Sequence, residues 1–115
     1  MTITIFHNPR CSKSRATLAL LQENSVEPDI RLYLEDPPDA AELMDILAKL
    51  DMSPRQLMRK GEAAYGEQGL ADGNLGDEAL VAAMVATPRL IERPIVLANG
   101  KAAIGRPPES VLEIL

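Results

Sequence analysis

The sequence predicts a mixed α/β domain in which a strand–helix–strand unit comes first and a strand–strand–helix unit comes last. Apolar, β-branched residues at 2–6 lead directly into a helical pattern, and an Asn-Gly pair at 99–100 separates two further apolar runs. Between these ends, from about residue 39 to 87, the apolar spacing is helical. A chain of 115 residues is long enough for its own core, so we expect a single domain over residues 1–115 with a helical insertion.

The first part of the chain reads as a βαβ unit. Residues 2–6 have the β-branched content of a short buried strand, and because Met1 stands directly before them we expect no targeting segment ahead of the fold. A turn at 8–9 leads into a helix that runs from about residue 11 or 12 to residue 23. Apolar and polar residues then alternate at 29–34, which predicts a half-exposed strand. Two strands joined by a helix of this length are expected to be parallel, with a right-handed crossover.

Helix signals divide the insertion. A capping box at Asp39 and Glu42 begins a helix that runs to about Lys49. The Ser-Pro pair at 53–54 begins a second helix, which we expect to end at Arg59.

The rest of the insertion is rich in glycine. Four glycines fall within residues 61–73 and predict loops, and a third helix starts at 76–77 and ends at 87–88.

The last part of the chain reads as a ββα unit. Residues 94–98 and 101–104 are strands joined by the Asn-Gly turn, which is the strongest short hairpin signal. A turn at 105–108 leads into a closing helix whose apolar residues include Val111, Leu112 and Leu115. A βαβ unit followed by a ββα unit is the thioredoxin-like arrangement, so we expect a thioredoxin-like mixed sheet. That fold carries a cis-proline at the start of the third strand, where Pro94 stands.

Composition excludes several classes of function. The net charge is −5, the sequence contains no Trp, and aromatics make up 3% of it, so neither nucleic acid nor a membrane surface is an expected partner. One cysteine allows no internal disulfide, and with no long apolar run we expect a soluble, cytoplasmic monomer. One His and one Cys cannot supply a zinc site, so we expect no metal and no bound cofactor.

The residues that can carry chemistry gather at 7–15, which hold the only His and the only Cys of the chain. Cys11 stands where the first helix would begin, among free backbone N–H groups and cationic side chains. All of these favour the thiolate, so we interpret Cys11 as a nucleophile that faces an anion. The other interpretation is a buried structural cysteine.

Two neighbours of Cys11 could support it. Ser14 takes the place of the second cysteine in a C-x-x-C motif, so a redox cycle must take its second thiol from outside the chain. Its hydroxyl could hydrogen-bond the thiolate or an oxyanion, or Ser14 could be a first-turn helix residue with no further role. His7 could favour the thiolate as a base or a cation, or be a strand-end residue bonded to backbone.

Arginines in Gly/Pro-rich turns could complete an anion site, because guanidinium pairs bidentately with tetrahedral oxyanions. Arg93 precedes Pro94 and, in the expected fold, lies near Cys11. Taken singly, arginines in such turns are more often solvated surface charges. The candidates are Arg59, Arg93 and Arg106. Arg10, Lys13 and Arg15 could be outer members of the same field or solvated charges.

Four stretches, in order and spanning nearly the whole chain, resemble the short members of the glutaredoxin-dependent arsenate reductase family. They are residues 3–15, 57–62, 90–96 and 104–109. The resemblance implies that Cys11 attacks arsenate, that glutathione attacks the adduct, and that glutaredoxin removes the glutathione so that arsenite leaves.

The resemblance also implies roles for single residues. It gives Arg59, Arg93 and Arg106 the binding or stabilisation of the oxyanion, His7 a part in ionising the thiol, and Ser14 a place beside it.

Two alternatives stay open. One is a non-catalytic regulator that binds RNA polymerase, as Spx-type relatives on this fold do, although these usually carry C-x-x-C. The other is a glutathione-dependent thiol transferase.

Overall fold

The computed structural model describes residues 2–115; Met1, and the expectation made there, lie outside the described residues. Contacts divide the chain into two compact units. We call them the sheet unit, which comprises the residues up to Asp36 together with Arg93–Leu115, and the helical unit, Pro37–Glu92. The helical unit contains the predicted insertion, and the sheet unit is built from both ends of the chain.

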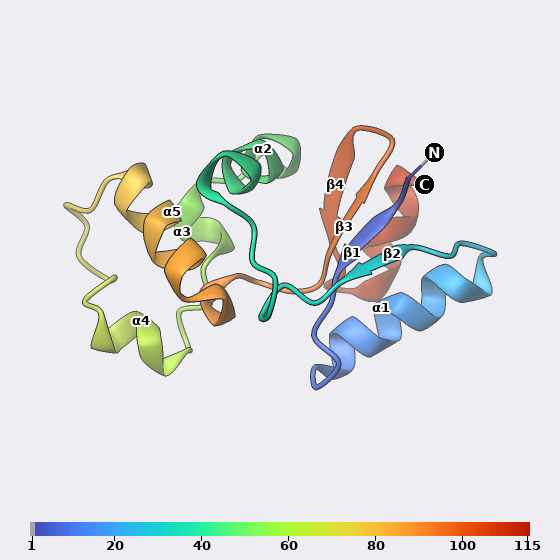
Figure 1. Ribbon diagram of the computed structural model, residues 1–115, viewed down its shortest axis with the longest axis horizontal. Helices are drawn as coiled ribbons and strands as arrows, with labels where there is room; N and C mark the ends of the chain where they lie inside the picture. The colour runs from blue at the N-terminus through green and yellow to red at the C-terminus, as the bar shows by residue number, and fades with distance from the viewer. Residues whose placement is uncertain (1) are drawn as a thin grey trace. The chain divides into compact units, whose positions relative to one another are not determined.

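The sheet unit holds a four-stranded mixed sheet in the order β2-β1-β3-β4 (Figure 1). Its elements are β1 (Thr4–Phe6), α1 (Ser12–Glu23), β2 (Asp29–Arg31), β3 (Ile95–Ala98), β4 (Lys101–Ile104) and the 3₁₀ helix η2 (Pro108–Ile114). Strand β1 pairs parallel with β2 and antiparallel with β3, and β3 pairs antiparallel with β4. The predicted thioredoxin-like sheet of βαβ plus ββα is confirmed.

The core of the sheet unit lies between the sheet and the two helices that cover it, α1 and η2, which also contact each other. It consists of aliphatic side chains, as the scarcity of aromatics requires. The buried members are Ile5, Leu21, Val96, Ala98, Val111 and Ile114. Burial of such side chains is the main favourable term in folding, so this layer holds β1 and α1 in fixed register, and with them the turn between them.

The hairpin follows the prediction, and Pro94 has the cis bond that the thioredoxin-like fold carries at this position. Asn99 and Gly100 both have positive φ, 56° and 73°, which is the requirement of a type I′ turn. The Arg93–Pro94 peptide bond is cis, at the start of β3, and the Arg106–Pro107 bond is also cis.

The buried stripe of α1 differs from the apolar pattern of its sequence. Its buried residues are Ser14, Thr17 and Leu21, so the half of the stripe nearer Cys11 is polar. The purely apolar half begins only where the helix reaches the core.

The helical unit consists of α2 (Ala40–Leu50), α3 (Pro54–Leu57), α4 (Ala63–Glu67), α5 (Asp77–Ala86) and the 3₁₀ helix η1 (Pro88–Leu90). Helix α5 packs against α2, α3 and η1. The predicted N-cap at Asp39 is present, with its carboxylate accepting from the Glu42 N–H. Ser53 and Gln56 form a complete capping box at α3.

Four details of the sequence prediction are wrong, and two concern the sheet unit. Strand β2 ends at Arg31 rather than at residue 34, because the chain turns there and Tyr33 is buried in a stack on Phe6. The closing helix is 3₁₀, so it buries Val111 and Ile114 three residues apart and leaves Leu112 and Leu115 exposed.

The other two concern the helical unit. Helix α3 ends at Leu57 and not at Arg59, because the backbone at 57–59 becomes extended and hydrogen-bonds to residues 90 and 92. The glycine-rich segment contains the short helix α4. Among residues 2–115, no helix combines the length and apolar character needed to cross a membrane.

Candidate active site

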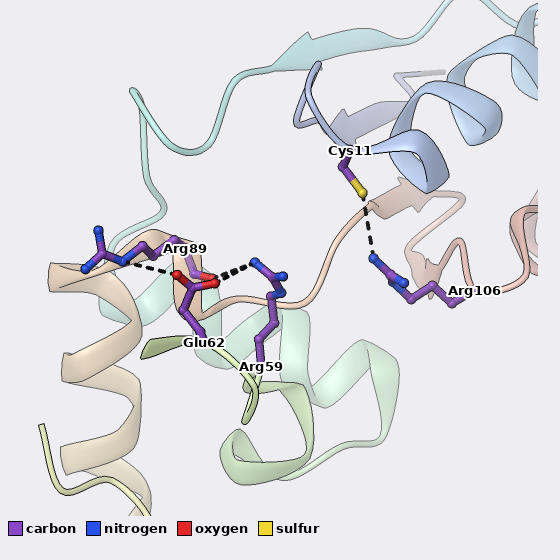
Figure 2. Close-up of polar contacts among 5 residues, drawn as sticks. All are labelled: Cys11, Arg59, Glu62, Arg89 and Arg106. Atoms are coloured by element: carbon purple, nitrogen blue, oxygen red, sulfur yellow. Dashed lines mark hydrogen bonds and ion pairs between the residues drawn. The ribbon is translucent and has the colours of Figure 1, made fainter. Parts of the chain in front are cut away.

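Cys11 is the N-cap of α1, as the sequence predicts (Figure 2). The turn ahead of it is closed locally: Asn8 accepts from the Arg10 N–H through its side chain (3.0 Å) and from the Cys11 N–H through its carbonyl (3.0 Å). Cys11 itself has an extended backbone, and the Ser14 and Lys13 N–H groups in the first turn of α1 act on its sulfur. The side chain is 8% exposed.

Opposing influences set the acidity of this thiol. Burial is the largest and raises the pKa of Cys11, but the other influences together outweigh it, so the pKa lies below its ordinary value. In order of size, they come from the Ser14 backbone N–H, the Arg93 guanidinium, the Lys13 backbone N–H and the Arg106 guanidinium. The helix start and the arginines therefore both favour the thiolate.

Arg106 touches the sulfur directly. Its Nη2 lies 3.7 Å from Cys11 Sγ (Figure 2). Its Nε donates to the Arg93 carbonyl at 2.8 Å. The second bond fixes the direction of the guanidinium plane, and Arg106 is otherwise an exposed residue. A guanidinium held in this way beside a nucleophile can bind a tetrahedral oxyanion in position for attack.

His7 and Ser14 form a buried pair behind the turn. His7 Nδ1 and Ser14 Oγ are 2.6 Å apart, and Ser14 Oγ also accepts from the Asn8 N–H at 3.0 Å. Burial first and the Arg15 guanidinium second lower the pKa of His7, so the imidazole is neutral at neutral pH. The ring therefore holds Ser14, whose own backbone N–H lowers the pKa of Cys11.

Arg59 belongs to the helical unit and is held there by Glu62. The Glu62 carboxylate lies 3.1 Å from Arg59 Nη1 and 3.6 Å from Arg89 Nε, and Arg59 also donates to the Arg89 carbonyl (Figure 2). Its backbone N–H donates to the Leu90 carbonyl at 2.8 Å. The segment around Arg59 is thus fixed by pairing with the segment after α5.

The structure brings Cys11, Arg93 and Arg106 together in the sheet unit, with His7 and Ser14 behind them. Whether Arg59 joins them stays a prediction, as do the catalytic roles of the whole set. Sequence reasoning missed Glu62, although its spacing of three from Arg59 is a signal for an ion pair. It also missed the close contact of Thr17 with Gly105, because the sequence around neither residue carries a signal for it.

Comparison with known proteins decides the family. A sequence model of the ArsC family matches residues 6–114. The chain belongs to the ArsC family. This confirms the family resemblance found in the motifs around Cys11 and the arginines.

Relatives match this ArsC chain along its whole length. The Escherichia coli K12 protein YfgD, itself uncharacterized, is 63% identical over 114 residues, which cover 98% of this chain and 96% of that protein. An arsenate reductase of Neisseria meningitidis serogroup A is 53% identical, with 98% and 97% covered. Among solved structures, the arsenate reductase from Vibrio cholerae superposes with a TM-score of 0.97 at 51% identity and covers 100% of this chain and 98% of its own.

Proposed function

We propose that this ArsC chain is an arsenate reductase that converts As(V) to As(III) through a covalent adduct on Cys11. The observation that carries the proposal is the 3.7 Å contact between Arg106 Nη2 and the sulfur of a thiol whose pKa is lowered. A nucleophile and a bidentate oxyanion binder at one point suit an anion such as arsenate. The names of the Neisseria and Vibrio relatives support the same substrate.

The first step uses the chain's own residues. The Cys11 thiolate attacks arsenic, an As–S bond forms, and one arsenate oxygen takes up protons and leaves as water. Arsenic stays As(V) in this step. Arg106 and Arg93 offset the negative charge on the remaining oxygens, and the N–H groups at the helix start favour the thiolate form of the sulfur.

The reduction needs two external thiols, because the chain has one cysteine. Glutathione adds to arsenic and a second water leaves. A glutaredoxin thiolate then attacks the glutathione sulfur, so that the As–S bond to glutathione breaks and its electron pair stays on arsenic. Water finally cleaves the bond between Cys11 and As(III), which releases arsenite and the thiol. Two thiols have become one mixed disulfide, and arsenic has gained two electrons.

Arg59, His7 and Ser14 have supporting roles in the proposal. Arg59 binds the oxyanion, and the His7–Ser14 pair keeps the first turn of α1 in place beside the sulfur. No resident cofactor takes part. The reaction belongs in the cytoplasm, where glutathione keeps thiols reduced, and needs one copy of the chain.

A coupled assay tests the proposal. The purified chain is mixed with glutathione, glutaredoxin, glutathione reductase and NADPH, and NADPH oxidation is followed with and without arsenate. We expect arsenate-dependent oxidation that requires both thiol components and disappears in Cys11→Ser. An arsenate response no greater than that of Cys11→Ser would overturn the catalytic role of Cys11. Oxidation with a disulfide substrate and no response to arsenate would point to a thiol transferase instead.

A further inference from the structure

Gly105 is the point at which the segments carrying Cys11, Arg93 and Arg106 meet. A Cβ atom placed on Gly105 would overlap Thr17 Oγ1 of α1 and lie 2.8 Å from Pro94 Cγ. Real Cβ atoms essentially never come this close to another heavy atom. We propose that Gly105 is a positioning residue: because it has no side chain, α1 and the Pro94 turn close on the segment that presents Arg106 to Cys11.

The reason for a glycine here is packing and not backbone conformation. The glycines with positive φ are Gly69 and Gly100, and Gly105 is not among them. Gly105 is buried, and both of its close neighbours are buried as well. An alanine could therefore adopt the backbone angles, and its methyl group alone would push the neighbours away.

On one side, Gly105 is tied to the arginine-bearing turn. Its N–H donates to the Pro94 carbonyl at 3.0 Å, and Arg106 Nε donates to the Arg93 carbonyl at 2.8 Å. These bonds extend the β3–β4 pairing beyond its last residue pair, Ile95 and Ile104. A displacement of Pro94 would thus move both arginines of the sheet-unit site.

On the other side, Gly105 is tied to the cysteine-bearing helix through Thr17. Thr17 is fully buried, and its Oγ1 donates to the Lys13 carbonyl at 2.8 Å, one turn nearer Cys11. The backbone N–H groups of Lys13 and Ser14 are those that favour the Cys11 thiolate. A displacement of Thr17 would therefore be felt in the first turn of α1.

The positions of both Cys11 and Arg106, which are 3.7 Å apart, thus depend on the close packing of Gly105 against Thr17 and Pro94. This proposal rests on the proposed arsenate reductase activity, because it says what aligns Cys11 with Arg106 for that reaction. Its test can nevertheless be made without arsenate. Cys11 is the only thiol of the chain, so its ionisation is read directly from the pH dependence of alkylation by iodoacetamide.

Four variants are compared with the wild type: Gly105→Ala, Thr17→Ala, the double variant Thr17→Ala/Gly105→Ala, and Gly73→Ala as the matched control. A Cβ on Gly73 would meet no atom within 4 Å. Thr17→Ala deletes Oγ1 and Cγ2, two of the three atoms that the new methyl group would meet.

For Gly105→Ala we expect the pKa of Cys11 to rise by about half a pH unit or more, because the arginines move away from the sulfur. We expect Gly73→Ala to keep the wild-type value. Thr17→Ala loses the hydrogen bond to the Lys13 carbonyl and sets the baseline for the double variant, which we expect to return most of the way to the value of Thr17→Ala. Such non-additivity is the sign of a shared contact and would not follow from a general loss of stability, which a parallel thermal unfolding measurement records.

A folded Gly105→Ala with the wild-type pKa would overturn the proposal. So would a double variant with a pKa no closer to that of Thr17→Ala than Gly105→Ala has, because the overlap with Thr17 would then not be the cause. If Gly105→Ala alone does not fold, the double variant decides: a folded protein with a Cys11 pKa near that of Thr17→Ala supports the proposal. An unfolded double variant, or a folded one with a higher pKa, contradicts it. Failure of the arsenate assay leaves this result unaffected, so the two claims fail separately.

Discussion

Cys11 owes its acidity to groups from different parts of the chain. The backbone N–H groups of Ser14 and Lys13 come from its own helix. Far along the sequence, Arg93 lies just before β3 and Arg106 just after β4. Together they overcome the burial of the sulfur, which by itself would raise the pKa of Cys11. The local contribution could be predicted from the sequence, because a cysteine at a helix start is visible in the pattern. The sequence could only suggest the distant one.

Arg106→Gln tests the distant contribution. The variant matches the arginine side chain as far as Cδ and stays polar, but it removes the guanidinium charge beside Sγ. We therefore expect the pKa of Cys11 to rise and kcat/KM for arsenate to fall about 10- to 100-fold. The alkylation profile and the coupled assay measure the two effects. Lys101→Gln is the control, because it removes one cation at the turn end of the same hairpin. Equal losses in the two variants would mean that net charge, and not the contact with sulfur, is what matters.

His7 gives the stability of the fold a pH dependence. The pKa of His7 is lowered in the folded chain by burial and by Arg15, whereas in the unfolded chain it is near ~6.5. Between these two values the unfolded chain binds more protons, so the free energy of unfolding decreases as the pH falls below ~6.5.

Chemical denaturation at several pH values between 7.5 and 5.5 measures this slope. We expect His7→Gln to reduce it, since His7 is the only histidine. An unchanged slope in the variant would show that other groups cause it.

At the scale of elements, the hairpin is the part that sequence predicted best. Asn99 and Gly100 specify a type I′ turn through their own backbone preferences, and the turn fixes the register of β3 and β4. The cap of α2 at Asp39 is equally local. The ends of β2 and η2 were mispredicted because they depend on tertiary packing: Tyr33 is drawn onto Phe6, and a 3₁₀ repeat buries Val111 with Ile114.

Gly100→Ala tests the turn. With φ at 73°, an alanine would occupy a conformation that costs L-residues about 1 kcal/mol, so we expect the free energy of unfolding to fall by about that amount. Denaturant titration measures it. The exposed Gly73 has ordinary φ, so Gly73→Ala should change stability by less than about 0.5 kcal/mol. A Gly100→Ala variant as stable as the wild type would contradict the assignment of a type I′ turn.

In the helical unit, the ion-pair cluster of Glu62 with Arg59 and Arg89 fixes a loop. The Glu62 carboxylate is 24% exposed and serves two guanidinium groups, so we expect Glu62→Gln to lower the free energy of unfolding by about 1 kcal/mol. Asp45→Asn breaks a more exposed pair with Lys49 and should cost only about 0.3 kcal/mol. Denaturation in low and high salt measures both. If the two variants cost the same, the cluster is no more than a set of surface charges.

At the scale of the whole molecule, the sheet unit is assembled from the two ends of the chain. The Cys11–Arg106 contact joins residues 95 positions apart, and it exists because β1 lies beside β3 in the sheet. From the sequence, the thioredoxin-like order of elements could be predicted, because each element carries its own local signal. The close approach of Thr17 to Gly105 could not, since it depends on how α1 sits against the hairpin.

The same distinction applies to function. The candidate nucleophile and its lack of a partner thiol can be read from the sequence, because it contains one cysteine, and the ArsC family membership is confirmed by comparison. The roles of the arginines depend on geometry and are matters for experiment.

The proposal is that arsenate is reduced while it is bound covalently to Cys11, and its product, As(III), can be measured directly. Arsenate is incubated with the chain, glutathione and glutaredoxin, and As(III) is separated from As(V) and quantified over time. We expect As(III) to form well above the level without the chain, and Cys11→Ser to form no more than that level. As(III) formation by Cys11→Ser at the wild-type rate, or none by the wild type above the level without the chain, would contradict the proposal.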